Sequence, residues 1–179
     1  MTDISHAAAG SARSLPLRVL DVPGRVVDRL GQGARDVALV AVRVALAVPF
    51  FNSGLTKWDG FGRLSAGAVY LFTEEFRLHL FGAEIAYPLP KLMAAMAGSA
   101  EIALPILLVA GLATRWAALG LLGMTAVVQL TVPDGWANFH LPWAAMALAL
   151  TVFGPGRLAL DRFLATPPSC GDRSPGGSV

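Results

Sequence analysis

VALVAVRVALAVPFFNSGLTKW, residues 37–58, is the stretch around which the rest of the sequence is organised. A helix of this length reaches roughly 33 Å at 1.5 Å per residue, which is enough to cross the hydrocarbon core of a membrane. The stretch also carries Arg43, Asn52 and Lys57 among its apolar residues. Ionisable side chains inside a membrane are costly unless they have partners, so we expect the remainder of the chain to supply those partners.

The composition favours a membrane protein over a soluble domain. Hydrophobic residues make up 55% of the 179 residues and charged residues only 15%, against about a quarter charged in typical soluble domains. The net charge of +2 is too small to argue for a nucleic-acid partner, and none is expected. The single cysteine, Cys170, excludes an internal disulfide, a CxxC redox pair and an iron–sulfur cluster held by this chain alone.

Three further apolar blocks follow the first, at residues 89–110, 114–132 and 138–153. Gly111 is expected to end the second block, the sequence Pro133-Asp134-Gly135 to form a turn after the third, and Gly154 to end the fourth. The sequence therefore predicts an all-α fold, a four-helix transmembrane bundle in residues 36–164. A basic leader, residues 1–35, precedes this domain, and a disordered Pro/Gly/Ser-rich tail, residues 165–179, follows it.

Residues 59–87 carry too many charges to cross a membrane. Within them, residues 63–81 place apolar side chains at helical spacing, which predicts an extracytoplasmic interfacial helix between helices one and two, packed over the mouth of the bundle. Glu75 and His79 would share one face of that helix. Two such residues without a further ligand do not make a metal site, and no metal is expected.

The distribution of arginines predicts the topology. Arg35 and four other arginines lie in the leader, Arg115 lies between helices two and three, and Arg157 and Arg162 follow helix four. With four spans, all these positions fall on one side of the membrane. Since cytoplasmic loops are enriched in Lys and Arg, both termini are expected to be cytoplasmic.

Arg43 and Glu101 are the predicted intramembrane ion pair. Counted from the cytoplasmic ends of their apolar blocks, Arg43 lies roughly 10 Å deep and Glu101 roughly 14 Å deep, so the two depths agree within one helical turn. The alternative is that Arg43 extends to the inner interface while Glu101 stays protonated or faces water.

Toward the outer side, Asn52, Lys57, Gln129 and His140 form a candidate polar pocket beneath the predicted interfacial helix. Ordinary interhelical hydrogen bonding is the alternative interpretation of the same residues. The sequence contains no phosphate loop, no nucleophile–base motif and no dinucleotide fingerprint, so catalytic residues are not assigned and enzyme activity stays open.

Arg43 followed by FFNSGLTKW resembles the first-helix signature of the DoxX family. The segment EIALPILLVAGLATRWAALGL, which begins at Glu101, is similar to the second-helix signature, and WANFHLPWAAMALAL followed by FGPGRLALDR resembles the last helix and its exit. The resemblance covers residues 36–164. It implies a small multi-pass protein of the bacterial inner membrane, in contact with the lipid bilayer.

The resemblance also implies a range of functions, because members of the family accompany quinol oxidases, thiosulfate:quinone oxidoreductases and detoxification enzymes. The leading hypothesis is a non-catalytic membrane subunit that supports a redox, stress or metal-homeostasis system together with a protein partner. One alternative is a quinone-interacting oxidoreductase subunit, in which Arg43, Lys57, Glu101 or His140 would contact a quinone oxygen. The other alternative is a small transporter.

Overall fold

The computed structural model describes residues 21–164. The chain divides into two compact units, residues 1–34 and 35–179, and each is described by itself. In the first unit, helix α1 (Asp21–Thr56) begins and is interrupted at Gly31, whose φ of 65° lies in the left-handed region. The predicted tail, residues 165–179 with Cys170, and the first part of the predicted leader, residues 1–20, lie outside the described residues.

The second unit is built from the remainder of α1 and from helices α3 (Pro90–Ala110), α4 (Thr114–Thr131) and α5 (Leu141–Phe153). Gly111 and Gly154 follow α3 and α5 with φ values of 72° and 74°, which explains why the helices end there. The predicted helices at residues 89–110 and 114–132 are therefore confirmed to within one residue at each end. The last predicted helix starts later than residue 138, because Trp136–His140 forms a separate π-helical turn, η3.

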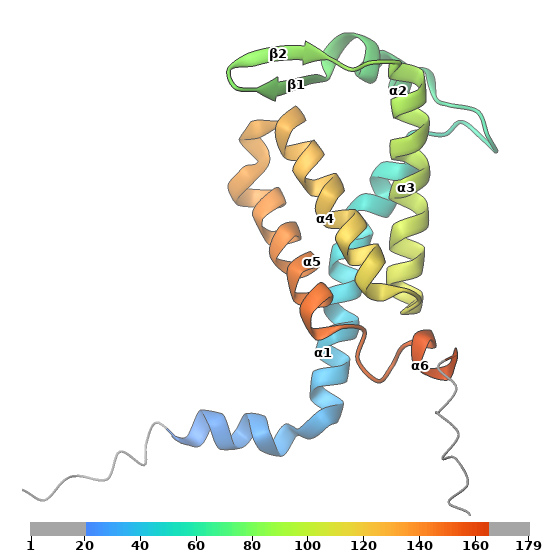
Figure 1. Cartoon of the computed structure of the whole chain (residues 1–179). Helices are drawn as coiled ribbons and strands as arrows, with labels where there is room; N and C mark the ends of the chain where they lie inside the picture. The colour runs from blue at the N-terminus through green and yellow to red at the C-terminus, as the bar shows by residue number, and fades with distance from the viewer. Residues whose placement is uncertain (1–20, 165–179) are drawn as a thin grey trace, which may run out of the picture. The chain divides into compact units, whose positions relative to one another are not determined.

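All four of these helices contribute to one hydrophobic core, and Figure 1 shows them running side by side. The buried core residues are Leu46, Ala47, Phe50, Leu108, Ala117, Ala118, Leu121, Ala147 and Leu150. Alanines make up much of the contact surface, which lets the helix backbones approach closely.

Among the described residues, two helical segments are long and apolar enough to cross a membrane. They are Gly33–Thr56, within α1, and Pro90–Ala110, which is α3.

The segment between α1 and α3 corrects one prediction. Instead of one helix over residues 63–81, the chain forms helix α2 (Ala66–Tyr70), the π-helical turn η1 (Leu71–Glu75) and an antiparallel hairpin of strands β1 (Arg77–Leu80) and β2 (Ala83–Ala86). The apolar residues up to Phe76 do follow a helical period. Beyond that point polar and apolar residues alternate, and Phe81-Gly82 turns the chain with positive φ at both positions, as a two-residue hairpin loop requires.

Residues 157–162, called here the exit segment, return from α5 to the turn between α3 and α4. The carboxylate of Asp161 accepts hydrogen bonds from the backbone N–H groups of Ala113 (2.8 Å) and Thr114 (3.3 Å). It thereby caps helix α4, whose N-cap residue Ala113 has no side-chain acceptor. Helix α6 (Leu160–Leu164) begins within this segment.

Candidate functional site

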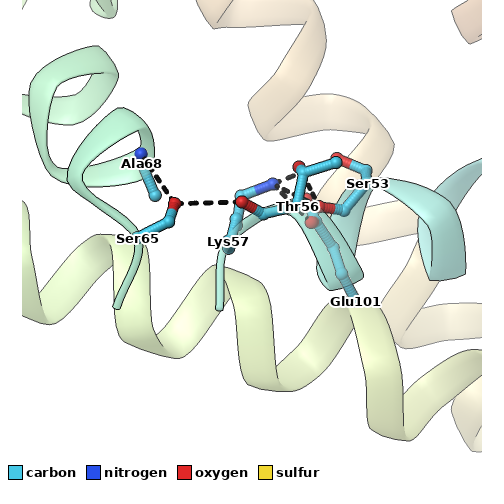
Figure 2. Close-up of polar contacts among 6 residues, drawn as sticks. All are labelled: Ser53, Thr56, Lys57, Ser65, Ala68 and Glu101. Carbon is cyan, nitrogen blue, oxygen red and sulfur yellow. Dashed lines mark hydrogen bonds and ion pairs between the residues drawn. The ribbon is translucent and has the colours of Figure 1, made fainter. Parts of the chain in front are cut away.

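A largely buried ion pair joins Lys57, the residue that follows α1, to Glu101 in the middle of α3. Nζ of Lys57 lies 2.5 Å from Oε2 of Glu101, and the two side chains are only 12% and 7% exposed. Lys57 also donates a hydrogen bond to Oγ of Ser53 at 3.0 Å. Figure 2 shows Lys57 turning back beside its own helix to reach both partners.

Two glycines explain why α1 and α3 come close enough for this pair. A methyl group on Gly54 would lie 2.9 Å from a side-chain carbon of Ile102 and 3.0 Å from the backbone carbon of Glu101. One on Gly98 would lie 3.1 Å from Cβ of Lys57. Both contacts are shorter than ordinary van der Waals separations, so larger residues at these positions would push the helices apart.

Ser65 anchors the chain that leaves this pair. Its backbone N–H donates to the carbonyl of Lys57 (2.9 Å) and its hydroxyl donates to the carbonyl of Thr56 (2.9 Å). The same hydroxyl oxygen accepts a hydrogen bond from the backbone N–H of Ala68, capping α2 (Figure 2). The position of Lys57 is therefore set by backbone contacts on both sides.

The ion pair lines a mostly apolar cavity of about 500 Å³. Its walls come from α1, α3, α4 and the segment between α1 and α3. The lining includes Ser53, Lys57, Phe72, Phe76, Tyr87, Met93, Met96, Ala97, Ala100, Glu101, Gly120, Gly123, Met124, Val127, Val128, Thr131 and Val132. A cavity of this size and polarity, with a few convergent polar groups, is typical of a small-molecule site.

Aromatic residues cover the end of the cavity nearest the hairpin of β1 and β2. The ring of Phe72 packs against those of Phe76 and Tyr87, with centroids 5.2 and 5.4 Å apart. The hydroxyl of Tyr87 is 2.6 Å from Oγ1 of Thr131, so it ties this cover to the end of α4. Nδ1 of His79 adds a second tie, 3.1 Å from the carbonyl oxygen of Leu130.

The predicted ion pair between Arg43 and Glu101 is wrong. Arg43 donates instead to the carbonyl of Leu158 at 2.6 Å, and Glu101 binds Lys57. The helices explain why: Gly54 packs against Glu101, whereas Arg43 packs against Gly111, so the two charges lie at levels roughly 15 Å apart along α3. Depths counted from the ends of apolar blocks could not reveal this alignment.

The structure does not gather Asn52, Lys57, Gln129 and His140 into one pocket. Lys57 lines the cavity, but Asn52 is exposed. Gln129 and His140 bind each other instead, with Oε1 of Gln129 2.6 Å from Nδ1 of His140. For this second pair, ordinary interhelical hydrogen bonding is the better description.

Glu75 and His79 do not share one face of a helix as predicted, because Glu75 ends the turn η1 and His79 lies on strand β1. Within residues 21–164, no three His, Cys, Asp or Glu side chains are grouped as metal ligands.

The site offers a hydrogen-bond donor, the ammonium group of Lys57, beside the carboxylate of Glu101. An ammonium group has three N–H donors, and Glu101 and the hydroxyl of Ser53 take two from Lys57 at short distances. The third has only the carbonyl of Ser53 at 3.5 Å. Lys57 can therefore donate to an acceptor on a molecule in the cavity.

Comparison with known proteins adds one result. The DoxX family model matches residues 38–134, more than half of the chain. The matched region contains Arg43, Lys57 and Glu101, and ends before η3, α5 and the exit segment. No curated protein and no solved structure matches the chain.

Proposed function

The chain belongs to the DoxX family of membrane proteins, and we propose that it is a four-helix membrane subunit that supports a redox system by binding a quinone beside Lys57. The observation that carries this proposal is the buried Lys57–Glu101 pair in the wall of the apolar cavity. Intramembrane ionisable residues usually mark functional sites.

The outward faces of the helices support membrane insertion of residues 36–164. Large apolar side chains on each of the four helices are at least 40% exposed, although a soluble bundle would present polar residues there. They include Val44, Val48, Ile106, Val109, Leu119, Val127, Leu148 and Val152. Helix α4, with 18 residues, reaches about 27 Å, and η3 lengthens the shorter α5 toward the same span.

Arginines at one end of the second unit support the proposed orientation. Arg35 lies over the ring of Phe153, 5.9 Å from its centre. Arg115 lies beside Gly154, and the backbone of Arg157 binds the carboxylate of Asp36 at 2.8 Å. An end this rich in arginine is expected in the cytoplasm, with both termini on that side of a bacterial inner membrane.

The polarity of the cavity favours a neutral ligand with a hydrogen-bond acceptor. Lys57 and Glu101 together carry no net charge, so an anionic ligand at Lys57 would also meet the Glu101 carboxylate. A quinone offers a neutral ring and carbonyl oxygens, which suit an apolar wall and a single ammonium donor. Among the systems that the family accompanies, this ligand favours a redox system.

The packing of the bundle does not favour the transporter alternative. The core residues Leu46, Phe50, Leu108 and Leu121 are buried. They fill the bundle between the level of Glu101 and the level of Arg43, where a permeation path would have to pass.

Quinone binding to the purified protein in nanodiscs tests the proposal, measured as quenching of tryptophan fluorescence. We expect saturable binding that falls about tenfold or more in Lys57→Met, since one hydrogen bond from a charged donor contributes about 1.5–3 kcal/mol. Asn52→Ala is the matched control, because Asn52 is exposed on α1, five residues before Lys57, and does not line the cavity. Equal quinone affinity in Lys57→Met and the unchanged protein, with both folded, would contradict the proposal.

A further inference from the structure

The cavity reaches the surface of the protein between α3 and α4. Met96 on α3 and Val127 on α4 both line it, and they are 57% and 47% exposed. The two helices are joined at residues 111–113 and diverge toward the end that carries the hairpin (Figure 1). In a membrane, an opening on this face leads into the hydrocarbon region and not into water.

Small residues set the width of the opening. Ala97 and Ala100 line it from α3, and Gly120 and Gly123 line it from α4. The two glycines differ in what lies in front of them. A methyl group on Gly120 would lie 2.9 Å from a side-chain carbon of Leu104, whereas one on Gly123 would meet nothing within 4 Å. Leu104 therefore closes the gap at Gly120, and the gap is open at Gly123, nearer the hairpin.

Flexible side chains border the same opening. Met93, Met96 and Met124 all line the cavity, and unbranched methionine adapts its shape to irregular apolar groups. The polar groups Ser53, Lys57 and Glu101 belong to another wall, at the contact between α1 and α3. The cavity thus has a polar wall that suits a head group and an apolar opening that suits a chain.

We infer that the ligand is a quinone with a long apolar side chain, which enters from the bilayer and leaves its chain between α3 and α4 at Gly123. This inference rests on the proposed function and adds the class of ligand and its route. A phospholipid has a similar chain, but its phosphate would meet the carboxylate of Glu101 beside Lys57. The charge of the site therefore favours the neutral quinone head.

Gly123→Leu tests the route, because a leucine at this open position fills the gap and favours the helix. The matched control is Ala126→Leu, on the same helix at an exposed position that does not line the cavity. Both variants and the unchanged protein are titrated in phosphatidylcholine nanodiscs with a benzoquinone that has no side chain and with one that carries a decyl chain.

Gly123→Leu is expected to weaken binding of the decyl quinone about tenfold or more while binding of the chain-free quinone changes less than about twofold. Ala126→Leu should change neither affinity. Equal weakening of both quinones, or of neither, would overturn the route even though quinone binding itself is upheld. If the unchanged protein binds neither quinone, the proposed function falls and the inference falls with it.

A second arm separates the two sources of a long chain. The decyl quinone titration is repeated in nanodiscs that contain phosphatidylglycerol. We expect the affinity to be unchanged. The opposite result is that phosphatidylglycerol competes with the decyl quinone in the unchanged protein and that this competition disappears in Gly123→Leu. That result would identify a phospholipid as the occupant and overturn the assignment to quinone.

Discussion

Two basic side chains, Arg43 in α1 and Lys57 directly after it, are placed in different ways. Lys57 has an acidic partner and faces a cavity. Arg43 is 1% exposed and donates to the carbonyl of Leu158, while its Nε and Nη1 have no partner among the described residues. A methyl group on Gly111 would lie 2.5 Å from Nη1, so there is no room beside the guanidinium.

The contrast separates the proposed binding site from a structural contact. A charge beside a cavity can exchange one of its contacts for a ligand, whereas a charge enclosed by backbone cannot. Arg43 instead holds the exit segment against the turn between α3 and α4, where Asp161 caps α4. The following predictions test this contrast, from the largest expected effect to the smallest.

Removing one member of the ion pair should have the largest effect. We expect Glu101→Ala to destabilise the folded protein by about 3–5 kcal/mol, because it leaves the largely buried ammonium of Lys57 without its acidic partner. Adding Lys57→Met should restore part of that loss. The measurement is reversible unfolding in mixed detergent micelles, analysed as a double-mutant cycle.

Arg43→Met is the control for that cycle. Since Arg43 and Glu101 do not touch, the effects of Arg43→Met and Glu101→Ala should add within about 0.5 kcal/mol. A strong coupling between them would show that the two charges interact, and would support the Arg43–Glu101 ion pair that the sequence predicted.

Gly54→Ala should destabilise by about 1–3 kcal/mol, because the added methyl group meets the backbone of α3 beside Glu101. Gly67→Ala is the matched control in α2, where nothing lies within 4 Å, and it should be neutral or slightly stabilising. Thermal unfolding of the purified variants measures both. Equal effects at the two glycines would mean that close packing at Gly54 is unimportant.

Asp161→Ala should cost about 1 kcal/mol through loss of the cap on α4. Quinone affinity should be unchanged, because the exit segment lies at the Arg43 end of the helices. Unfolding and fluorescence titration on one preparation check both statements. A large loss of quinone affinity with the fold intact would argue that the two ends are coupled.

Tyr87→Phe should have an effect on stability as small as that of Asp161→Ala, about 0.5–1.5 kcal/mol for one hydrogen bond to Thr131. The hairpin of β1 and β2 should then exchange its amide hydrogens faster than in the unchanged protein. Tyr70→Phe is the control, since Tyr70 is 56% exposed. Unchanged exchange in Tyr87→Phe would show that the cover is held by other contacts.

Local signals in the sequence predicted the helices well, and non-local contacts explain the errors. Gly111 and Gly154 end α3 and α5 through their own backbone conformation, which neighbouring residues are enough to indicate. The single helix predicted at residues 63–81 was wrong because only the first half of the segment has a helical period. In the second half, polar and apolar residues alternate, as in a strand. The turn at Phe81 was missed because phenylalanine rarely adopts a positive φ, so this residue type does not indicate a turn.

The sequence by itself determined the family, the apolar helices and the presence of Arg43, Lys57 and Glu101 in or beside those helices. Each depends on residue type and spacing along the chain. Only the tertiary structure decided which of these charges meet, because the alignment of α1 with α3 is set by the close contacts of Gly54 and Gly98. The same contacts place Lys57 and Glu101 together beside the cavity and leave Arg43 with the exit segment.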